Sequence, residues 1–320
     1  MTKSTRDFYH KYNFIPALLL IIFLCMILSG CQDSGSASST SVEKISSQTM
    51  QSKFDKIEYP TAPGTLTEGN DLVSLDCSNL SEGYLGVLYK GSCSKVKLQI
   101  VGSNETIYTY NLPTNQVYLP LTSGDGSYKI TVFENVKDDQ YSTAFSTTVN
   151  ASIKDPLLPF IYSNMYVDYA DAPNTVSMAD DLQKECTSDL EYIGKVYHYI
   201  IENISYDEEE AKNVAFDYLP VLDEVLSTKK GICFDYAALM AGMLRAQGIP
   251  TRMEVGYAGE AYHAWISTYI EDIGWIDKII QFDGHNWSLM DPTFASSQNN
   301  SKAIQKFIGD GNNYNTLYTY

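Results

Sequence analysis

The stretch KKGICFDYAALM, Lys229–Met240, decides the fold of the C-terminal half of this chain. Its single cysteine, Cys233, stands between a glycine that permits a tight turn and an apolar run with helical spacing. A thiol in the first turn of a helix lies beside free backbone N–H groups and the positive end of the helix dipole, which favour negative charge. The stretch therefore predicts a helix that starts near Cys233, and it leaves open whether the thiol is reactive or a small buried core residue.

The segments around this stretch have the patterns of helices and then of strands. SDLEYIGKVYHYIIENI begins with a capping box, Ser188 with Glu191, and continues as an amphipathic helix. A second short helix follows Pro220. After Gly248, strands are expected in TRMEVGY, in YHAWISTYI and around residues 279–282. Helices followed by an antiparallel sheet predict an α+β domain.

The N-terminal half has a different hydrophobic period. From about residue 65 to 153 apolar residues alternate with polar ones, and the period of two is clearest in KVKLQI and SYKITV. Turn signals recur between these short runs, at residues 102–104, 113–115 and 124–126. This spacing predicts an antiparallel β-sandwich rather than βαβ units. The segment contains no histidine, and we expect no catalytic group in it.

The first 30 residues have the form of a secretory signal. Three basic residues precede an apolar run that ends in LSGC, Leu28–Cys31, which resembles the lipobox of bacterial lipoproteins. The resemblance implies a lipid on Cys31, the membrane as a partner through that lipid, and a protein anchored on the extracellular face. An ordinary signal peptide or a transmembrane anchor is the alternative. The serine-rich residues 31–64 are expected to form a flexible tether.

The net charge of the chain restricts its possible partners. The chain carries 39 acidic and 22 basic side chains, a net charge of -17, which argues against nucleic acid as a partner.

Cys77 and Cys93 lie in one strand-and-turn region and could form a disulfide, but the sequence leaves this open. Cys186 falls in a helical stretch and is expected to pack in the core.

A cysteine nucleophile needs a base beside it and a group that orients the base. His263 lies 30 residues after Cys233 in an expected strand, and Asp291 opens the turn Asp291-Pro292-Thr293. His285 is a rival base, but a glycine-flanked turn holds an imidazole less firmly than a strand does. A zinc site built from the same residue types is a further alternative, although no pair has the short spacing of structural zinc ligands.

Three sequence motifs resemble the cysteine, histidine and aspartate motifs of the transglutaminase-like superfamily and occur in the same order as in that family. They are GICFDYAALMAGMLRAQGIPTRMEVGY, YHAW and LMDPTFA. The resemblance implies a papain-like α+β core over residues 177–310. A proline-containing connection, residues 154–176, is expected to link this core to the β-sandwich. The resemblance also implies that Cys233 is the nucleophile, His263 the general base and acid, and Asp291 the group that orients the imidazole. No metal or cofactor is implied.

The resemblance leads to two hypotheses of different classes. The first is an extracellular cysteine acyl transferase or hydrolase that acts on amide bonds of proteins or cell-wall peptides through a thioester. The second is a binding module that keeps the fold without turnover. Within the first, we favour hydrolysis over transamidation, because water resolves an acyl-enzyme unless the site excludes it. The second oxyanion donor, besides the Cys233 N–H, stays unassigned, as does the role of Trp265, Trp275 and Trp287.

Overall fold

The computed structural model describes most of the chain beyond residue 53. The ranges are residue 54 and residues 59–215, 217–271, 273–276, 280–282, 287–289 and 313–320. Within these ranges no helix is long and apolar enough to span a bilayer. The predicted signal peptide and lipidated Cys31 lie outside the described residues, as do Asp291 and His285.

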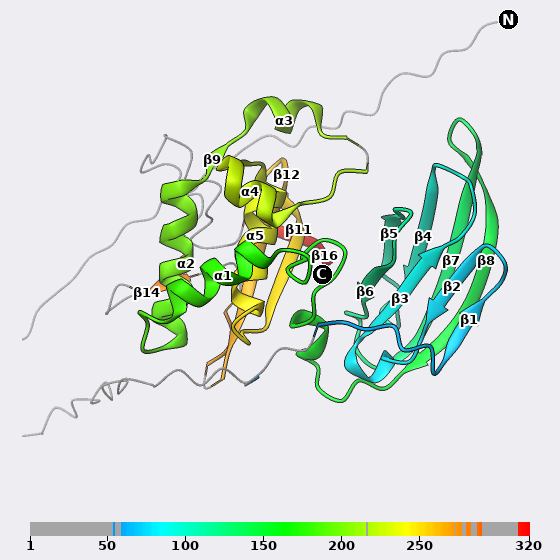
Figure 1. The fold of residues 1–320 in the computed structure, drawn as a ribbon, viewed down its shortest axis with the longest axis horizontal. Helices are drawn as coiled ribbons and strands as arrows, with labels where there is room; N and C mark the ends of the chain where they lie inside the picture. Colours follow the sequence, from blue (N-terminus) through cyan, green and yellow to red (C-terminus); the bar gives the residue numbers. More distant parts are fainter. Residues whose placement is uncertain are drawn as a thin grey trace, which may run out of the picture. The chain divides into compact units, whose positions relative to one another are not determined.

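The N-terminal half consists of two four-stranded antiparallel sheets (Figure 1). The first has the order β1-β2-β3-β6 and contains Thr67–Gly69, Val73–Asp76, Tyr84–Tyr89 and Val117–Pro120. The second has the order β5-β4-β7-β8 and contains Ile107–Asn111, Val96–Val101, Gly126–Lys137 and Gln140–Ala151. A short 3-10 helix, Leu80–Glu82, precedes β3. The predicted β-sandwich is confirmed.

Alternation along the strands explains why the two sheets pack face to face. Val96, Leu98 and Ile100 of β4 are buried, whereas the residues between them are half-buried. Leu75 of β2 and Leu85 of β3 belong to the same apolar cluster from the other sheet. Period-two burial of this kind places one face of each sheet in a shared core.

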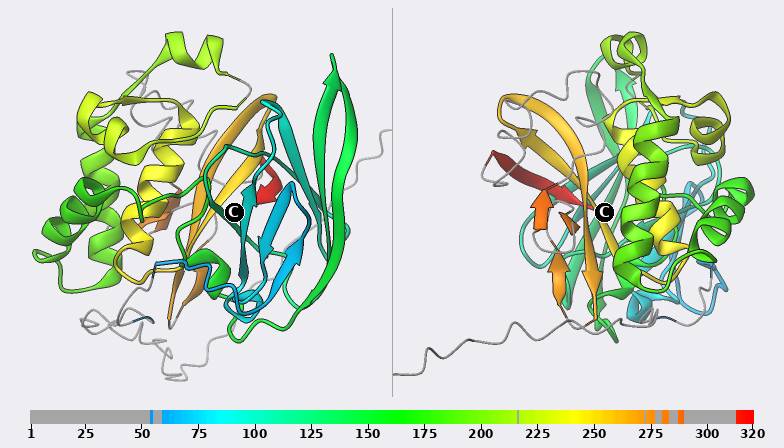
Figure 2. Two further views of the ribbon diagram at one scale, coloured as in Figure 1. Left: turned by 45° about the vertical axis from the view of Figure 1, so that its right-hand side comes forward. Right: turned by 90° about the vertical axis from the view of Figure 1, so that its left-hand side faces the viewer.

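The C-terminal half places helices against one antiparallel sheet (Figures 1 and 2). Its helices are α1 (Pro173–Gln183), α2 (Asp189–Asn203), α3 (Glu208–Asn213), α4 (Leu222–Thr228) and α5 (Cys233–Arg245). The sheet has the order β13-β12-β11-β16 and contains Gly274–Ile276, Ala261–Ile270, Thr251–Ala258 and Tyr314–Thr319. Helix α5 is buried along almost its whole length and contacts β11 and β12. The predicted α+β class is confirmed.

Local signals identified the helix ends correctly. Ser188 caps α2 by accepting a hydrogen bond from the Glu191 N–H at 3.2 Å. The Glu191 carboxylate, however, accepts from the backbone N–H of Thr187 at 2.8 Å rather than from that of Ser188. Gly248 follows α5 with φ 79°, the left-handed conformation that glycine adopts without strain.

Two strands differ from the sequence expectation. The strand expected around residues 279–282 is β14, Ile280–Phe282, and among the described strands it pairs with β15, Trp287–Leu289, in a separate two-stranded sheet. The edge strand β16 was not expected, because it lies beyond residue 310 and pairs with β11 across about sixty residues of chain. A side chain at Gly256 would place its Cβ 2.0 Å from the Asn315 carbonyl oxygen, so this close pairing requires glycine.

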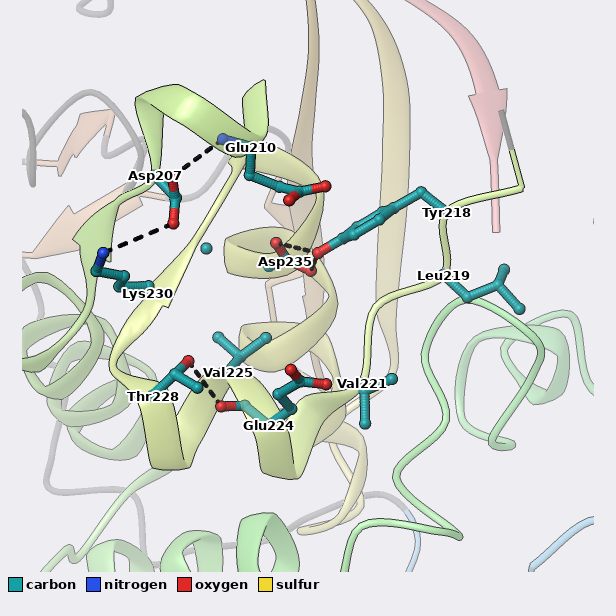
Figure 3. A pocket seen from close by; sticks show the side chains of 11 residues that line it. Asp207, Glu210, Tyr218, Leu219, Val221, Glu224, Val225, Thr228, Lys230 and Asp235 are labelled. Carbon is teal, nitrogen blue, oxygen red and sulfur yellow. Dashed lines mark hydrogen bonds and ion pairs between the residues drawn. The ribbon is translucent and has the colours of Figure 1, made fainter. Parts of the chain in front are cut away.

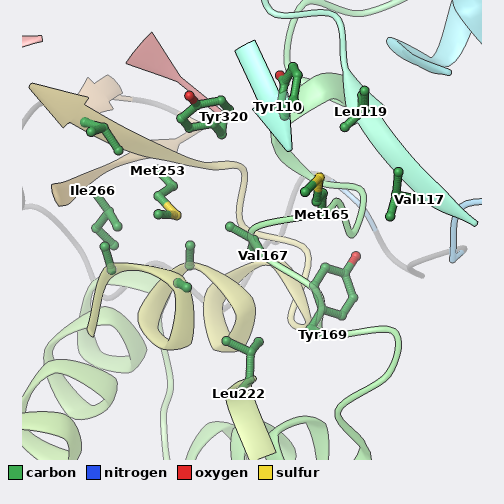
Figure 4. Packing of buried hydrophobic residues seen from close by; sticks show 14 of the residues in the cluster. Tyr110, Val117, Leu119, Met165, Val167, Tyr169, Leu222, Met253, Ile266 and Tyr320 are labelled. Atoms are coloured by element: carbon green, nitrogen blue, oxygen red, sulfur yellow. The ribbon is translucent and has the colours of Figure 1, made fainter. Parts of the chain in front are cut away.

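The connection between the halves is packed rather than extended in solvent. It contains a 3-10 helix, Leu158–Phe160, and α1 begins at Pro173, inside the expected linker. Figure 4 shows Met165, Val167 and Tyr169 of this segment beside sandwich residues, and all belong to one apolar cluster that runs through both halves. The β-sandwich and the C-terminal half therefore share one apolar core.

The four described cysteines are free. Cys77 is buried, and burial, with smaller contributions from Glu68 and Asp76, raises the pKa of its thiol to about 11. The Cys93 thiol lies 3.4 Å from the Lys95 carbonyl oxygen. The disulfide that the sequence left open between Cys77 and Cys93 is therefore not formed in this structure.

Candidate active site

Cys233 is the first residue of α5, as the sequence predicts. It follows the two-residue strand β10, Lys230–Gly231, which pairs in parallel with β9, Ser205–Tyr206. The backbone N–H of Ile232 donates to a carboxylate oxygen of Asp235 at 2.8 Å, which satisfies one of the free donors at the helix start. A side chain at Gly231 would place its Cβ 2.7 Å from the Asp235 Cβ, so glycine is needed immediately before this turn.

His263 lies on β12, opposite Gly256 of β11, and its side chain is only 5% exposed. Its ring lies near two aromatic rings, with centroid distances of 6.2 Å to Trp265 and 6.4 Å to Tyr314. Trp265 in turn donates from Nε1 to a carboxylate oxygen of Glu254 at 3.0 Å. Packing of this kind restricts the imidazole to few orientations.

Cys233 and His263 line the same cavity, which has a volume of about 540 Å³ and which we call the Cys233 cavity. The segments that line it come from α3, the loop before α4, α5, β9, β11, β12 and β16, with one residue each from the linker and from β5. Six of the lining side chains are tyrosines: Tyr166, Tyr206, Tyr218, Tyr262, Tyr318 and Tyr320. The structure thus brings together two of the three residues predicted for catalysis. The third, Asp291, and the rival base His285 lie outside the described residues.

Residues 176–278 match the transglutaminase-like superfamily. The chain therefore carries a transglutaminase-like core. Kyphoscoliosis peptidase of Mus musculus is 29% identical over 131 residues, which cover 37% of this chain and 18% of that protein. The Homo sapiens protein of the same name is 28% identical over 131 residues, with the same two coverages. The chain thus spans less than a fifth of the length of these two curated relatives.

Two solved structures are similar to the transglutaminase-like core and its surroundings. The periplasmic domain of TgpA from Pseudomonas aeruginosa is 16% identical, with 82% of this chain and 84% of that chain covered and a TM-score of 0.34. Red sea bream transglutaminase is 13% identical, with 71% of this chain and 53% of that chain covered and a TM-score of 0.31.

Tyr206 is a residue of the site that sequence reasoning did not assign. Its pairing with Gly231 places it in the wall of the Cys233 cavity, although 27 residues separate it from Cys233. Burial, followed by the negative charge of a Cys233 thiolate, raises the pKa of Tyr206 to about 12. The phenol therefore keeps its proton at neutral pH and can donate a hydrogen bond. Only the parallel pairing of β9 with β10 identifies it, and the sequence gives no local signal of that pairing.

A second, acidic cavity of about 240 Å³ adjoins the first and shares Tyr218 with it (Figure 3). Its charged lining residues are Asp207, Glu210, Glu224, Lys230 and Asp235. Asp207 caps α3 and lies 3.9 Å from Lys230 Nζ. Among the described residues, no group of three histidine, cysteine, aspartate or glutamate side chains is placed to hold a metal ion.

His198, Trp265 and Trp275 are not lining residues of the Cys233 cavity. His198 is exposed on α2. The Arg252 guanidinium carbon lies 3.6 Å from the centroid of a Trp275 ring, and Phe160 packs edge-to-face on Trp275 with ring centroids 5.4 Å apart. Trp265 therefore packs beside the candidate base, whereas Trp275 lies on β13, opposite Tyr269 of β12.

Proposed function

We propose that this protein is an extracellular, membrane-anchored cysteine acyl transferase or hydrolase that acts on amide bonds of proteins or cell-wall peptides. Cys233 is the nucleophile, His263 the general base and acid, and Asp291 the residue that orients the imidazole. The observation that carries this proposal is the shared cavity: a cysteine at a helix start and a buried histidine on a neighbouring strand line one space large enough for a peptide segment. No metal or cofactor takes part.

The reaction proceeds in two half-reactions. His263 takes the proton of the Cys233 thiol, and the sulfur attacks the amide carbonyl carbon. The Cys233 N–H and the Tyr206 hydroxyl donate hydrogen bonds to the oxyanion that forms. The tetrahedral intermediate then collapses: the C–N bond breaks, His263 gives its proton to the leaving amine, and a thioester remains on Cys233.

The second half-reaction resolves the thioester. His263 takes a proton from water, the hydroxide oxygen attacks the thioester carbonyl, and the carboxylic acid leaves as the thiol is restored. A primary amine in place of water would give a transamidated product by the same steps. We favour water, because water resolves an acyl-enzyme unless a site is built to exclude it.

The proposed location rests on the sequence. A lipid on Cys31 and the serine-rich tether would hold the enzyme at the extracellular face of the membrane. The net charge of -17 suits attachment through acyl chains rather than through anionic lipid headgroups.

The test is an activity assay with both possible acceptors. The protein is incubated with a glutamine-containing protein and a fluorescent primary amine, and the products are analysed for amine incorporation and for new N-termini. We expect new N-termini, no product with Cys233→Ala or His263→Ala, and residual product with Asp291→Ala. His198→Ala is the matched control and should retain full activity. Absence of both products over a broad panel, with an unreactive Cys233, would favour the binding-module hypothesis instead.

A further inference from the structure

The helix that carries Cys233 starts without the side chain that normally caps a helix. Its N-cap residue is Ile232, which has an extended backbone and no side-chain acceptor. A serine, threonine, aspartate or asparagine at this position would accept from the second or third backbone N–H of the helix. Such an oxygen would lie beside the Cys233 thiol and compete for these donors with a thiolate or an oxyanion. Ile232 cannot compete in this way.

Asp235 supports the helix start from inside the first turn. Its carboxylate accepts from the Ile232 N–H at 2.8 Å and thereby closes the turn that contains Cys233. Asp235 is only 1% exposed, and a Cβ at Gly231 would lie 2.7 Å from the Asp235 Cβ. The Asp235 side chain therefore packs directly against the backbone that leads into α5.

Tyr218 holds the Asp235 carboxylate from outside the helix. Its hydroxyl donates to that carboxylate, as Figure 3 shows. Tyr218 lies in the loop before α4, whose Leu222 and Val225 are buried, and α4 contacts α5. The tyrosine thus belongs to a segment that is itself packed on the helix whose start it supports.

The backbone before Ile232 is held by a different contact. The Gly231 carbonyl oxygen accepts from the Asp207 N–H at 2.9 Å, in the short parallel ladder of β9 and β10. With this bond on one side and the Asp235 carboxylate on the other, the residues on both sides of Cys233 have fixed partners. The position of Cys233 follows from theirs.

We infer that Asp235 and Tyr218 are positioning residues for Cys233, which fix the turn at residues 231–235 so that the thiol and the Cys233 N–H keep the orientation that attack on an amide carbonyl requires. A displacement of about 1 Å at a reacting group can lower a rate about 100-fold, so loss of this support should lower kcat. This effect on catalysis rests on the proposed function, whereas the fixed turn does not.

The first test measures the turn itself and needs no substrate. Hydrogen exchange of the Ile232 amide is followed by NMR in the folded full chain. Asp235→Ala should accelerate this exchange at least about tenfold and Tyr218→Phe at least about threefold, because each removes a contact that keeps the amide hydrogen-bonded. Asp235→Asn should stay within about twofold of the wild type, because its Oδ1 still accepts from Ile232 and its Nδ2 can donate to the Tyr218 oxygen.

The second test is steady-state kinetics with the glutamine-containing protein of the activity assay. We expect kcat to fall about 100-fold in Asp235→Ala and about tenfold in Tyr218→Phe, with KM within about threefold of the wild-type value. Asp235→Asn should restore most of the activity, because burial already raises the pKa of Asp235 and the position therefore does not require a negative charge. This rescue separates positioning by hydrogen bonds from an effect of charge.

Two changes of the same kinds serve as matched controls. Asp223→Ala removes a carboxylate that accepts from the Thr175 N–H at 2.7 Å, at the start of α1. Tyr192→Phe removes a hydroxyl that donates to the Met243 carbonyl oxygen at 2.9 Å, near the other end of α5. Both should lower the thermal stability, yet both should keep wild-type kcat and wild-type Ile232 exchange at temperatures well below unfolding.

The outcomes separate the inference from its alternatives. Unchanged Ile232 exchange in Asp235→Ala would overturn it, as would faster exchange without a fall in kcat. An equal fall in kcat in the two control variants would show a general loss of stability and would contradict a positioning role. The predicted exchange pattern in a protein without any turnover would sustain the fixed turn and contradict the proposed function.

Discussion

The Tyr218 hydroxyl oxygen lies 2.9 and 2.8 Å from the two carboxylate oxygens of Asp235, and it donates its proton to this carboxylate. Tyr218 lines both cavities, and Asp235 is in the first turn of the helix that carries Cys233. The contact, which Figure 3 draws, therefore joins a wall residue of the Cys233 cavity to the first turn of α5.

The first prediction concerns this contact. Tyr218→Phe removes a donor from a carboxylate that is only 1% exposed and leaves it with the Ile232 N–H at 2.8 Å. We expect the free energy of unfolding to fall by about 1–3 kcal/mol, which is the cost of an unsatisfied buried acceptor. Urea denaturation measures it. Tyr141→Phe, on the sandwich strand β8 and away from both cavities, is the control and should change it by less than about 0.5 kcal/mol.

The Asp235 carboxylate should also make the stability of the protein depend on pH. Burial, opposed by its hydrogen bonds, raises the pKa of Asp235 above its ordinary value of 3.8. The folded state therefore holds this proton more tightly than the unfolded state does, and the contribution of Asp235 to stability decreases as the pH rises through the interval between the two pKa values. Asp235→Asn removes this dependence. The stability of the variant relative to the wild type should thus increase from pH 4 upward. A difference in stability between the two proteins that does not change with pH would contradict a raised pKa of Asp235.

Arg245 provides a prediction about the joint between the halves. It is fully buried and donates to the carbonyl oxygens of Thr251 at 2.9 Å, Tyr162 at 3.0 Å and Tyr320 at 2.8 Å. Arg245→Met should destabilise the protein by at least about 3 kcal/mol, because the buried carbonyls of Thr251 and Tyr320 and the half-buried carbonyl of Tyr162 each lose a charged donor. Lys184→Met replaces an exposed cation in a surface ion pair and should cost less than about 1 kcal/mol. Thermal unfolding of both variants measures the two losses of stability, and equal losses would contradict the prediction.

Most of the fold was predictable because its signals are local. The capping box at Ser188, the glycine before Cys233 and the period-two runs of the sandwich each act over a few residues, and the structure confirms them. Strand β16 and the place of β5 beside the Cys233 cavity could not be predicted, because they depend on pairing and packing between distant segments. For the same reason the sequence does not assign Tyr206 and Tyr218 to the site. The sequence motifs around Cys233 and His263, in contrast, predict both of those residues.

Tyr206 carries a prediction about catalysis rather than stability. If its hydroxyl stabilises the oxyanion, Tyr206→Phe should lower kcat by about 10²- to 10³-fold and leave KM nearly unchanged. Alkylation of Cys233 by iodoacetamide passes through no oxyanion and should keep its rate. A parallel loss of both activities would instead indicate that Tyr206 supports the position of α5.

Cys31 can be tested in whole cells. Cys31→Ala should release the mature protein from the membrane fraction into the medium, because Cys31 is the residue to which the lipobox pattern assigns the lipid. Cell fractionation with an antibody against the protein measures this, and Cys25→Ala, in the apolar run, is the control that should stay membrane-bound. Continued membrane association of the Cys31 variant would contradict the lipobox interpretation.

The most direct test of the central claim is the rate of Cys233 alkylation by iodoacetamide at neutral pH, in the wild type and in His263→Ala. If His263 withdraws the thiol proton, Cys233 should react at least about tenfold faster than the half-buried Cys186 in the wild type. His263→Ala should remove this advantage, and His198→Ala should preserve it. A Cys233 that reacts no faster than Cys186, or one whose rate is unaffected by His263→Ala, would contradict the account.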